Sequence, residues 1–230
     1  EGLAGTGPKA GGPHYLRRFR RLAAPAESVE TSGNAVEGAA LLRFMPALDP
    51  AWSASGDRFA VLRKLLRGKG ADAMAAAAAL DQGPVDLPGP TGEANTLMLT
   101  PRGRVLCLGA SEDALLAQAI QALATGNAVL AVHPAASRVL KPLTGQGLPL
   151  SAVDGTVSPE ALSTVPDIDL VAASGVESWL KALRGALAGR KGAIVPLVTE
   201  VLYPAAYAHE RAICVDTTAA GGNASLLAAV

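Results

Sequence analysis

Short apolar runs that alternate with amphipathic segments dominate the second half of the chain. This alternation limits the possible folds more than any other feature. Five runs are apolar almost throughout, which is typical of strands that are buried on both faces of a sheet. These runs are 105–109, 128–132, 148–153, 169–173 and 193–198. Between them, segments 111–125 and 177–190 carry Leu and Ala at helical spacing, and Ser-Pro-Glu at 158–160 is expected to open a short helix. The alternation predicts an α/β fold, a Rossmann-like parallel sheet with helices on both faces.

A small helical segment is expected to precede this layer structure. Gly and Pro dominate residues 1–14, which predicts a loop, and residues 25–36 form a polar connector. Helices are expected at four places: 15–22, 37–44, 57–66 and 72–80. Residues 96–99 and 104–108 flank Thr-Pro-Arg-Gly, which is typical of a hairpin or a strand pair. Near the C-terminus, the apolar residues 213–215 are expected to add a strand.

Composition narrows the class of protein. Hydrophobic residues make up 50% of the chain, and 20 Lys and Arg balance 20 Asp and Glu. Such a composition is typical of a globular protein rather than a disordered or nucleic-acid-binding one. The longest apolar run, 73–80, is far short of the ~20 residues that cross a bilayer. Because the chain begins with Glu-Gly-Leu inside a glycine-rich loop, we expect it to be a piece of a longer polypeptide.

The first predicted strand does not lead into a dinucleotide-binding turn. The G-x-G-x-x-G fingerprint should follow that strand, but Gly109 stands alone there. Glu112 and Asp113 come next, where negative charge would repel a pyrophosphate at a helix start. GLAGTGPK at residues 2–9 resembles a phosphate loop only faintly. We therefore expect no dinucleotide binding of the fingerprint type.

The histidines and cysteines predict no nucleophilic or metal site. Cys107 and Cys214 cannot build a disulfide framework, which favours a reducing compartment. Cys214 lies among apolar residues, which predicts an inert core thiol. No His or Cys cluster has zinc-like spacing. Three histidines are present, and none accompanies a nucleophile elbow: His14, His133 and His209.

Three stretches resemble the proline utilization A family. Residues 1–16, EGLAGTGPKAGGPHYL, are similar to the end of the catalytic domain of its glutamate-semialdehyde dehydrogenase module. Residues 210–227, ERAICVDTTAAGGNASLL, resemble the C-terminal motif of its longer members, and LPGPTGEAN at 87–95 is a shorter match. The resemblance implies four parts: 1–24 ending the catalytic domain, 25–94 a helical connector, 95–209 a degenerate aldehyde-dehydrogenase-like Rossmann domain, and 210–230 the C-terminal motif.

The middle of the chain resembles the cofactor-binding half of the aldehyde dehydrogenase superfamily, with informative departures. Residues 102–134 have the superfamily's strand–helix–Gly-Asn–strand cadence. Ala-Ser-Glu at 110–112 stands where the superfamily has Pro-Trp-Asn, and His133 replaces the Lys that contacts the cofactor ribose. Glu200 falls at the general base, but no catalytic-cysteine segment follows before the C-terminal motif. Because a thiohemiacetal mechanism needs that nucleophile, the resemblance implies a domain that kept the scaffold and lost the chemistry.

The resemblance implies that the parent protein is a bifunctional enzyme that oxidises proline to glutamate. A FAD-dependent proline dehydrogenase would form 1-pyrroline-5-carboxylate, which hydrolyses to glutamate semialdehyde. An NAD-dependent dehydrogenase would oxidise that aldehyde to glutamate, and the intermediate would pass through an internal tunnel. FAD and NAD would belong to the parent. This segment is expected to be non-catalytic and to bind no cofactor or metal.

The same resemblance implies two sets of site residues. Backbone N–H groups of Gly11 and Gly12 would anchor the carboxylate of the aldehyde substrate, since glycine lets a backbone approach an anion closely. The C-terminal motif would cover the dehydrogenase module and close the tunnel. Its named residues are Asp216, Thr217, Thr218, Gly221, Gly222 and Asn223. The alternatives are a plain structural turn, and a tail that completes the domain's own sheet.

Two interpretations compete with a structural role. A nucleotide-binding regulatory module would use the Rossmann-like domain, and an independent enzyme has the least support because no nucleophile–base pair can be named. The expected partners are the catalytic modules of the same chain, and glutamate semialdehyde at the N-terminal loop. Neither nucleic acid nor a membrane is expected to contact this segment. We expect a cytoplasmic parent whose missing flavin module makes any contact with the inner membrane, and we leave homo-oligomerisation open.

Overall fold

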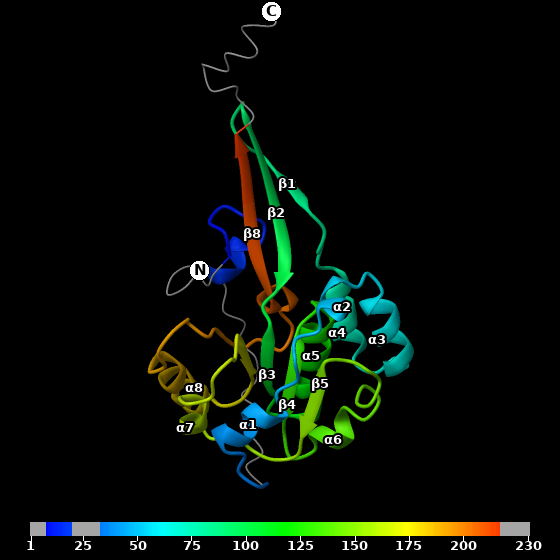
Figure 1. The fold of residues 1–230 in the computed structure, drawn as a ribbon, viewed down its shortest axis with the longest axis vertical. Coiled ribbons are helices and arrows are strands. Elements are labelled where there is room, and N and C mark those ends of the chain that lie inside the picture. Colours follow the sequence, from blue (N-terminus) through cyan, green and yellow to red (C-terminus); the bar gives the residue numbers. More distant parts are fainter. Residues whose placement is uncertain (1–7, 20–32, 217–230) are drawn as a thin grey trace, which may run out of the picture.

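The computed structural model describes residues 8–19 and 33–216. These residues form an α/β body from which a narrow antiparallel ribbon projects (Figure 1). The body contains a five-stranded sheet and the ribbon contains a three-stranded one. The candidate sites discussed below lie at one edge of the larger sheet and along the ribbon.

The five strands of the body form a parallel sheet. They are β3 Arg104–Leu108, β4 Ala128–Val132, β5 Leu150–Val153, β6 Leu170–Ala173 and β7 Leu197–Val198. Their order is β5-β4-β3-β6-β7, and each pair of neighbours is parallel. All five side chains of β4 are buried, because helices cover both faces of the sheet. The expected Rossmann-like α/β fold is confirmed, although β7 is shorter than the apolar run that predicted it.

Two hydrophobic clusters fill the two faces of this sheet. Side chains along β3 alternate between them, with Cys107 in one cluster and Leu106 in the other. Five helices contribute to the Cys107 side: α2 Pro50–Ala54, α3 Arg58–Leu66, α4 Ala71–Ala78, α5 Glu112–Ala124 and α6 Ala136–Val139. Three contribute to the Leu106 side: α1 Gly38–Phe44, α7 Pro159–Leu162 and α8 Glu177–Ala188. The sequence predicted all of these helices except α2 and α6.

The projecting ribbon consists of three antiparallel strands. They are β1 Val85–Leu87, β2 Glu93–Pro101 and β8 Ala208–Asp216, in the order β1-β2-β8. The pairing of β2 with β8 runs through all nine residues of each strand, from Glu93 opposite Asp216 to Pro101 opposite Ala208. The strand expected at 213–215 therefore exists and is longer than predicted. The sequence did not predict β1.

The prediction that residues 96–99 and 104–108 form a hairpin or a strand pair is wrong. The chain leaves the ribbon at Pro101 and enters the parallel sheet at Arg104, so the two strands lie in different sheets. Gly103 makes this change of direction with φ +128°. A Cβ on Gly103 would stand 2.2 Å from the Asp169 carboxylate, whose oxygen accepts from the Arg104 amide. Close packing against β6, rather than a tight turn, explains this glycine.

Two further expectations need correction. The helix expected at 15–22 is a 3₁₀-helix over Tyr15–Phe19, and residues 20–22 lie outside the described part of the chain. Cys214 is exposed rather than a core thiol, because β8 lies in the thin ribbon that projects from the body (Figure 1). The domain boundaries expected at 94/95 and 209/210 fall inside β2 and β8 and stay predictions.

The carboxyl end of α5 is buried, and side chains from distant segments donate to its last carbonyl groups. Trp52 Nε1 donates to the Leu123 carbonyl at 3.0 Å, and Arg58 Nε donates to the Ala124 carbonyl at 3.0 Å. A second nitrogen of Arg58 also donates to three carbonyl groups around the end of α2, those of Trp52, Ser53 and Ser55. Burial lowers the pKa of Arg58. These bonds satisfy carbonyl groups that a helix end leaves without partners.

Asn127 extends this network to both sheets. Its Oδ1 accepts from the Gly103 amide at 2.9 Å, and its Nδ2 donates to the carbonyl groups of Ala122 at 3.0 Å and Tyr207 at 2.9 Å. The side chain is fully buried. A single amide thus joins the start of β3, the end of α5 and the entrance of β8.

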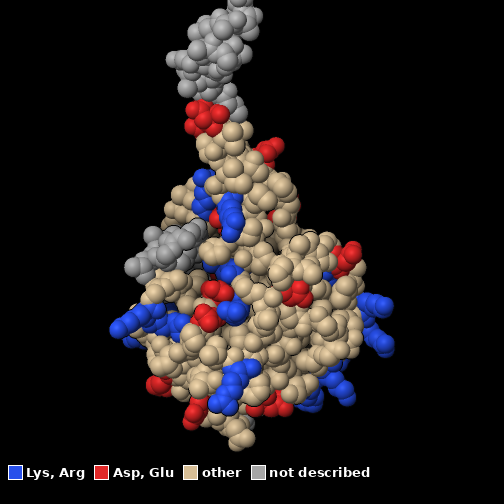
Figure 2. All heavy atoms as spheres, viewed as in Figure 1, with Lys and Arg blue, Asp and Glu red and all other residues tan. Residues whose placement is uncertain are grey.

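Charged residues of both signs are interspersed on the face of the molecule shown in Figure 2. Among the described residues, no helix is long and apolar enough to cross a membrane.

We predict that Asn127→Ala lowers the free energy of unfolding by about 3 kcal/mol, because it removes the Asn127 partner of the part-buried Gly103 amide and of the buried Tyr207 carbonyl. Urea denaturation followed by circular dichroism measures the loss. Asn95→Ala is the matched control, since its amide is exposed and donates to the Glu93 side chain, and we expect a change within about 0.5 kcal/mol. Equal losses for the two variants would contradict the central role of Asn127.

Candidate functional site

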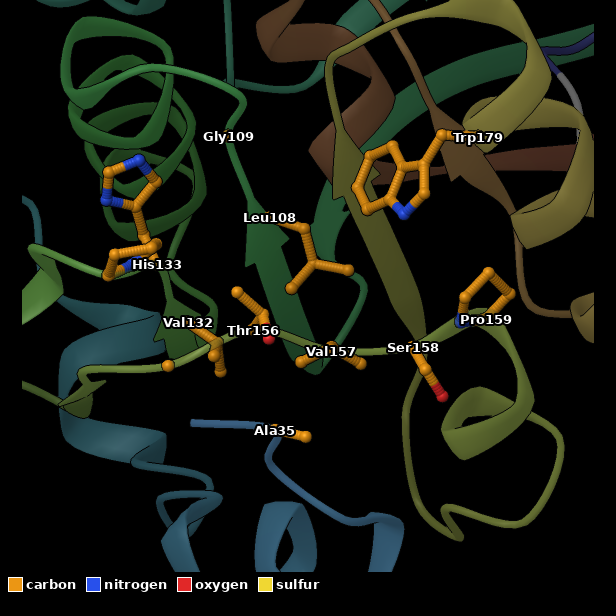
Figure 3. A pocket seen from close by; sticks show the side chains of 12 residues that line it. Ala35, Leu108, Gly109, Val132, His133, Thr156, Val157, Ser158, Pro159 and Trp179 are labelled. Carbon is orange, nitrogen blue, oxygen red and sulfur yellow. The ribbon is translucent and has the colours of Figure 1, made fainter. Parts of the chain in front are cut away.

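The carboxyl edge of the parallel sheet holds a pocket of about 260 Å³ (Figure 3). Open α/β sheets bind their ligands at this edge, where the loops after the strands diverge. The pocket walls come from the ends of β3 and β4, the loop after β5, α8 and the connector before α1. The lining residues are Ala35, Leu108, Gly109, Val132, His133, Pro134, Gly155, Thr156, Val157, Ser158, Pro159 and Trp179.

The start of α5, beside this pocket, does not suit a phosphate. Ser111 caps the helix by accepting from the Ala114 amide at 3.3 Å. The Ala110 amide donates to the Ser174 hydroxyl at 2.9 Å and is therefore already engaged. Glu112 and Asp113 occupy the first turn, and a hydrogen bond from Arg138 lowers the pKa of Glu112, which favours its ionised form. The sequence has no dinucleotide fingerprint at this turn. In the structure, the helix start carries two acidic residues, and the Ala110 amide already donates to Ser174.

Gly109 serves the packing of strand on helix. A Cβ at this position would lie 2.3 Å from the Leu115 amide nitrogen and 2.6 Å from the Leu115 Cα. Any larger residue would push α5 away from β3. The lone glycine of the predicted turn is thus required by the fold itself, and it is not by itself a sign of phosphate binding.

His133 lies in the pocket wall, 3% exposed. Its Nδ1 accepts from the Ala135 amide at 3.0 Å, so in this geometry Nδ1 carries no proton and the ring proton sits on Nε2. Its carbonyl also accepts from the Gly155 amide. His133 therefore joins the end of β4 to the loop after β5. It is a fixed part of the wall.

Neither thiol lies in this pocket. Complete burial raises the pKa of Cys107 far above its usual range, so this thiol stays protonated in the folded protein. The pKa of Cys214 is also raised, by partial desolvation and by the nearby carboxylates of Glu93 and Asp216. Within the described residues, no group of three or more His, Cys, Asp or Glu side chains could hold a metal ion.

The second candidate place is the N-terminal turn, which rests on the ribbon. The Lys9 amide donates to the Glu210 carboxylate of β8 at 2.6 Å, although the two residues lie 201 positions apart. The Gly12 amide donates to the Lys9 carbonyl at 2.9 Å and closes the turn. Gly11 has φ +75° with open space around it. The substrate-anchoring role expected for Gly11 and Gly12 stays a prediction.

Residues 217–230 of the C-terminal motif lie outside the described residues. Asp216 ends β8 opposite Glu93. The other named residues of the motif fall in the part that is not described: Thr217, Thr218, Gly221, Gly222 and Asn223. Their role in closing a tunnel stays a prediction.

Sequence patterns did not predict that several residues would take part in these sites. Trp179 was part of a predicted helix and Ser158 a predicted helix start, but nothing local placed either beside Val132. Glu210 is an ordinary acidic residue in the sequence, and its contact with the N-terminal turn depends on a pairing across almost the whole chain. Only tertiary structure brings such residues together.

Comparisons of the sequence and of the structure with known proteins both find proline utilization A proteins. No family model matches the chain. The bifunctional protein PutA of Escherichia coli is 36% identical over 99% of this chain, which spans 17% of that protein. A crystal structure of proline utilization A from Bradyrhizobium japonicum is 25% identical, with a TM-score of 0.55, over 71% of this chain and 22% of its own.

A more distant neighbour supports the fold alone. The structure of PnpE from a Pseudomonas species in complex with nicotinamide adenine dinucleotide is 18% identical, with a TM-score of 0.53, over 74% of this chain and 46% of its own. The resemblance to proline utilization A found in the sequence is confirmed. The chain corresponds to one segment of those proteins, about a sixth of the curated relatives by length.

The two thiols should differ sharply in reactivity. We predict that a disulfide reagent such as DTNB labels one thiol in the folded protein and two in urea, because Cys107 is buried and Cys214 is exposed. Since the pKa of Cys214 is raised, its labelling rate should keep increasing with pH above the usual thiol range, where more thiolate forms. Cys214→Ser should abolish labelling of the folded protein, and persistent labelling of that variant would show that Cys107 is accessible.

Proposed function

We propose that the chain is the C-terminal part of a bifunctional enzyme of proline catabolism. In the parent protein, a FAD-dependent module would oxidise proline, and an NAD-dependent module would oxidise the resulting glutamate semialdehyde to glutamate. This segment would itself be non-catalytic. Its role would be to support the dehydrogenase module and to close the tunnel through which the intermediate passes.

The main support for this proposal is that 99% of the chain matches a segment of a bifunctional PutA protein. The site chemistry supports a non-catalytic role for that segment. The residues lining the sheet-edge pocket include no thiol and no carboxylate, and the two thiols of the chain have raised pKa values. A covalent aldehyde oxidation needs an activated nucleophile beside the cofactor.

The ribbon supports the proposal that this segment packs against the catalytic module. Ile213 and Val215 are 47% and 52% exposed on β8, and they point to the same side of the strand because side chains alternate. Among the strands that the structure describes, β8 also lies at the edge of the ribbon sheet. Exposed apolar side chains along an open edge suit a surface that another part of the parent covers.

The Lys9–Glu210 contact supports a link between the two ends of the segment. In the proposal, the N-terminal turn belongs to the catalytic domain and anchors the aldehyde, while β8 leads into the tail that closes the tunnel. Glu210 holds the turn from one side of β8, and Asp216 ends the same strand where the tail begins. One strand would thus hold the anchoring turn and carry the cover of the tunnel.

A nucleotide-binding regulatory module is the second candidate. The pocket at the carboxyl edge of the sheet favours it, since this is where α/β sheets hold ligands. The acidic first turn of α5 and the occupied Ala110 amide weigh against a phosphate-bearing ligand. We therefore rank it below the structural role.

The tail is tested by a coupled assay on the full-length parent enzyme, from proline to NADH. We expect deletion of residues 216–230 to introduce a lag before NADH appears, with semialdehyde escaping into solution, because an open tunnel releases the intermediate. The matched control removes only residues 224–230, which follow the last named residue of the motif, Asn223, and should show no lag. Unchanged flux in the longer deletion, with folding intact by circular dichroism, would make the motif local structure and would favour the nucleotide-binding alternative.

The turn is tested by Gly11→Ala in the same parent enzyme. If Gly11 anchors the substrate, the strain of a Cβ at φ +75° should raise KM for the aldehyde several-fold more than it changes kcat. Gly145→Ala is the matched control, because Gly145 has φ +70° and equally open surroundings in a loop of the body. Identical kinetics for the two variants would leave the turn with a structural role only.

A further inference from the structure

The end of α3, the turn after it and the start of α4 line a second pocket, the α3–α4 pocket, which the proposed function does not use. It shares no lining residue with the pocket at the sheet edge. We propose that the α3–α4 pocket binds a small monocarboxylate with a short hydrocarbon chain, and that Arg63 and Lys69 hold the carboxylate. This inference is independent of whether the tail closes a tunnel.

The lining of the α3–α4 pocket carries positive charge and no acid. Of its seven residues, two are cations, Arg63 from α3 and Lys69 from the turn, and none is Asp or Glu. No described residue forms an ion pair or a hydrogen bond with either side chain. Lys and Arg side chains project from the margin of the body where α3 lies (Figures 1 and 2). An anion in the pocket therefore meets two cations that no described acid neutralises.

These two cations suit a singly charged carboxylate. A guanidinium group donates two parallel hydrogen bonds to the two oxygens of a carboxylate, and an ammonium group adds a compact charge. Both Arg63 and Lys69 are exposed, so their attraction is modest and decreases as salt is added. Asp72 lies outside the lining but in the first turn of α4, and it repels a doubly charged phosphate more than a carboxylate. The ligand therefore needs a second source of affinity besides charge.

Apolar groups in the α3–α4 pocket supply that second source. Leu66 and Met74 line it and belong to the hydrophobic cluster on the Cys107 side of the sheet. Ala71 and Ala75 also line it, four residues apart and hence on one face of α4. The hydrocarbon stems of the two cations extend this apolar surface. A bare inorganic anion leaves these groups in contact with water, whereas a hydrocarbon chain covers them, which is favourable.

The size of the α3–α4 pocket limits the length of that chain. The pocket measures about 260 Å³, which is below the range of about 300–1,000 Å³ that is usual for drug-sized ligands. A group of the size of a water molecule takes about 30 Å³, so roughly eight such groups fill the space. A carboxylate with a chain of about six to eight carbon atoms therefore fits, and a long fatty acid does not.

The turn that carries Lys69 is held in place on both sides. Before it, Arg67 ends α3 in the left-handed conformation with φ 50°, and its amide donates to the Arg63 carbonyl at 3.2 Å. After it, Gly70 packs so closely on α5 that a Cβ there would lie 2.3 Å from Ile120 Cδ1. The backbone of the pocket is therefore formed before any ligand arrives, which reduces the entropy lost on binding.

The test titrates octanoate into the whole 230-residue chain, labelled with ¹³C at its methionine methyl groups and followed by NMR. Of the three methionines, only Met74 lines the α3–α4 pocket, and Met45 and Met98 are internal controls. We expect octanoate to shift the Met74 signal saturably at millimolar concentrations and to leave the other two in place. Octanamide, which is uncharged, should bind at least fivefold more weakly. Butanoate should bind at least tenfold more weakly, because each buried methylene strengthens binding about threefold.

Two pairs of variants locate the binding. Changing Arg63 and Lys69 together to Gln should weaken octanoate at least tenfold, whereas Lys64→Gln, at an exposed position of α3 outside the lining, should change it less than twofold. Ala75→Leu should weaken octanoate at least tenfold by filling the pocket, whereas Ala78→Leu, exposed on α4 outside the lining, should not. Circular dichroism checks that all four variants fold.

Three results would each overturn the proposal. The first is the lack of a saturable shift of the Met74 signal with octanoate. The second is binding of octanamide as tight as that of octanoate, because the two cations would then play no part. The third is undiminished binding of octanoate by the folded double Gln variant or by folded Ala75→Leu.

Discussion

The carbonyl groups at the buried end of α5 have no access to water, and the rest of the structure depends on how they are satisfied. Trp52 and Arg58 donate to them from the helices before the sheet, and Asn127 donates from the turn that follows. Since a buried carbonyl without a partner costs as much as a lost hydrogen bond, these contacts fix where α2 and α3 can lie. The same asparagine holds Gly103 and Tyr207, so the ribbon leaves the body in one direction.

This arrangement separates two surfaces with different properties. The carboxyl edge of the sheet keeps the position of a ligand site but carries an acidic helix start and an uncharged pocket. The ribbon exposes Ile213 and Val215 and holds the N-terminal turn through Glu210. The pocket and the ribbon belong to different sheets, so contacts made through the ribbon do not require an occupied pocket.

The candidate sites were only partly predictable. Gly109, Glu112 and Asp113 are consecutive or nearly so, and their spacing alone indicated that no fingerprint for pyrophosphate is present. The resemblance of the two terminal motifs also identified the relatives correctly. Pocket residues such as Trp179 and Ala35 could not be found in this way, because they meet only after the sheet has formed. The error at 96–108 has the same origin, since a strand's partner is not encoded in its own pattern.

The sequence by itself determined the identity of the parallel strands and their helices, because burial on both faces demands continuous apolar runs and helical packing demands a period of 3.6 residues. It also determined the family resemblance, through long motifs at both ends. Only the tertiary structure decided that β2 pairs with β8 across more than a hundred residues, and that Glu210 meets the amide of Lys9. Local patterns specify what a segment can become, whereas its partner depends on how the whole chain closes on itself.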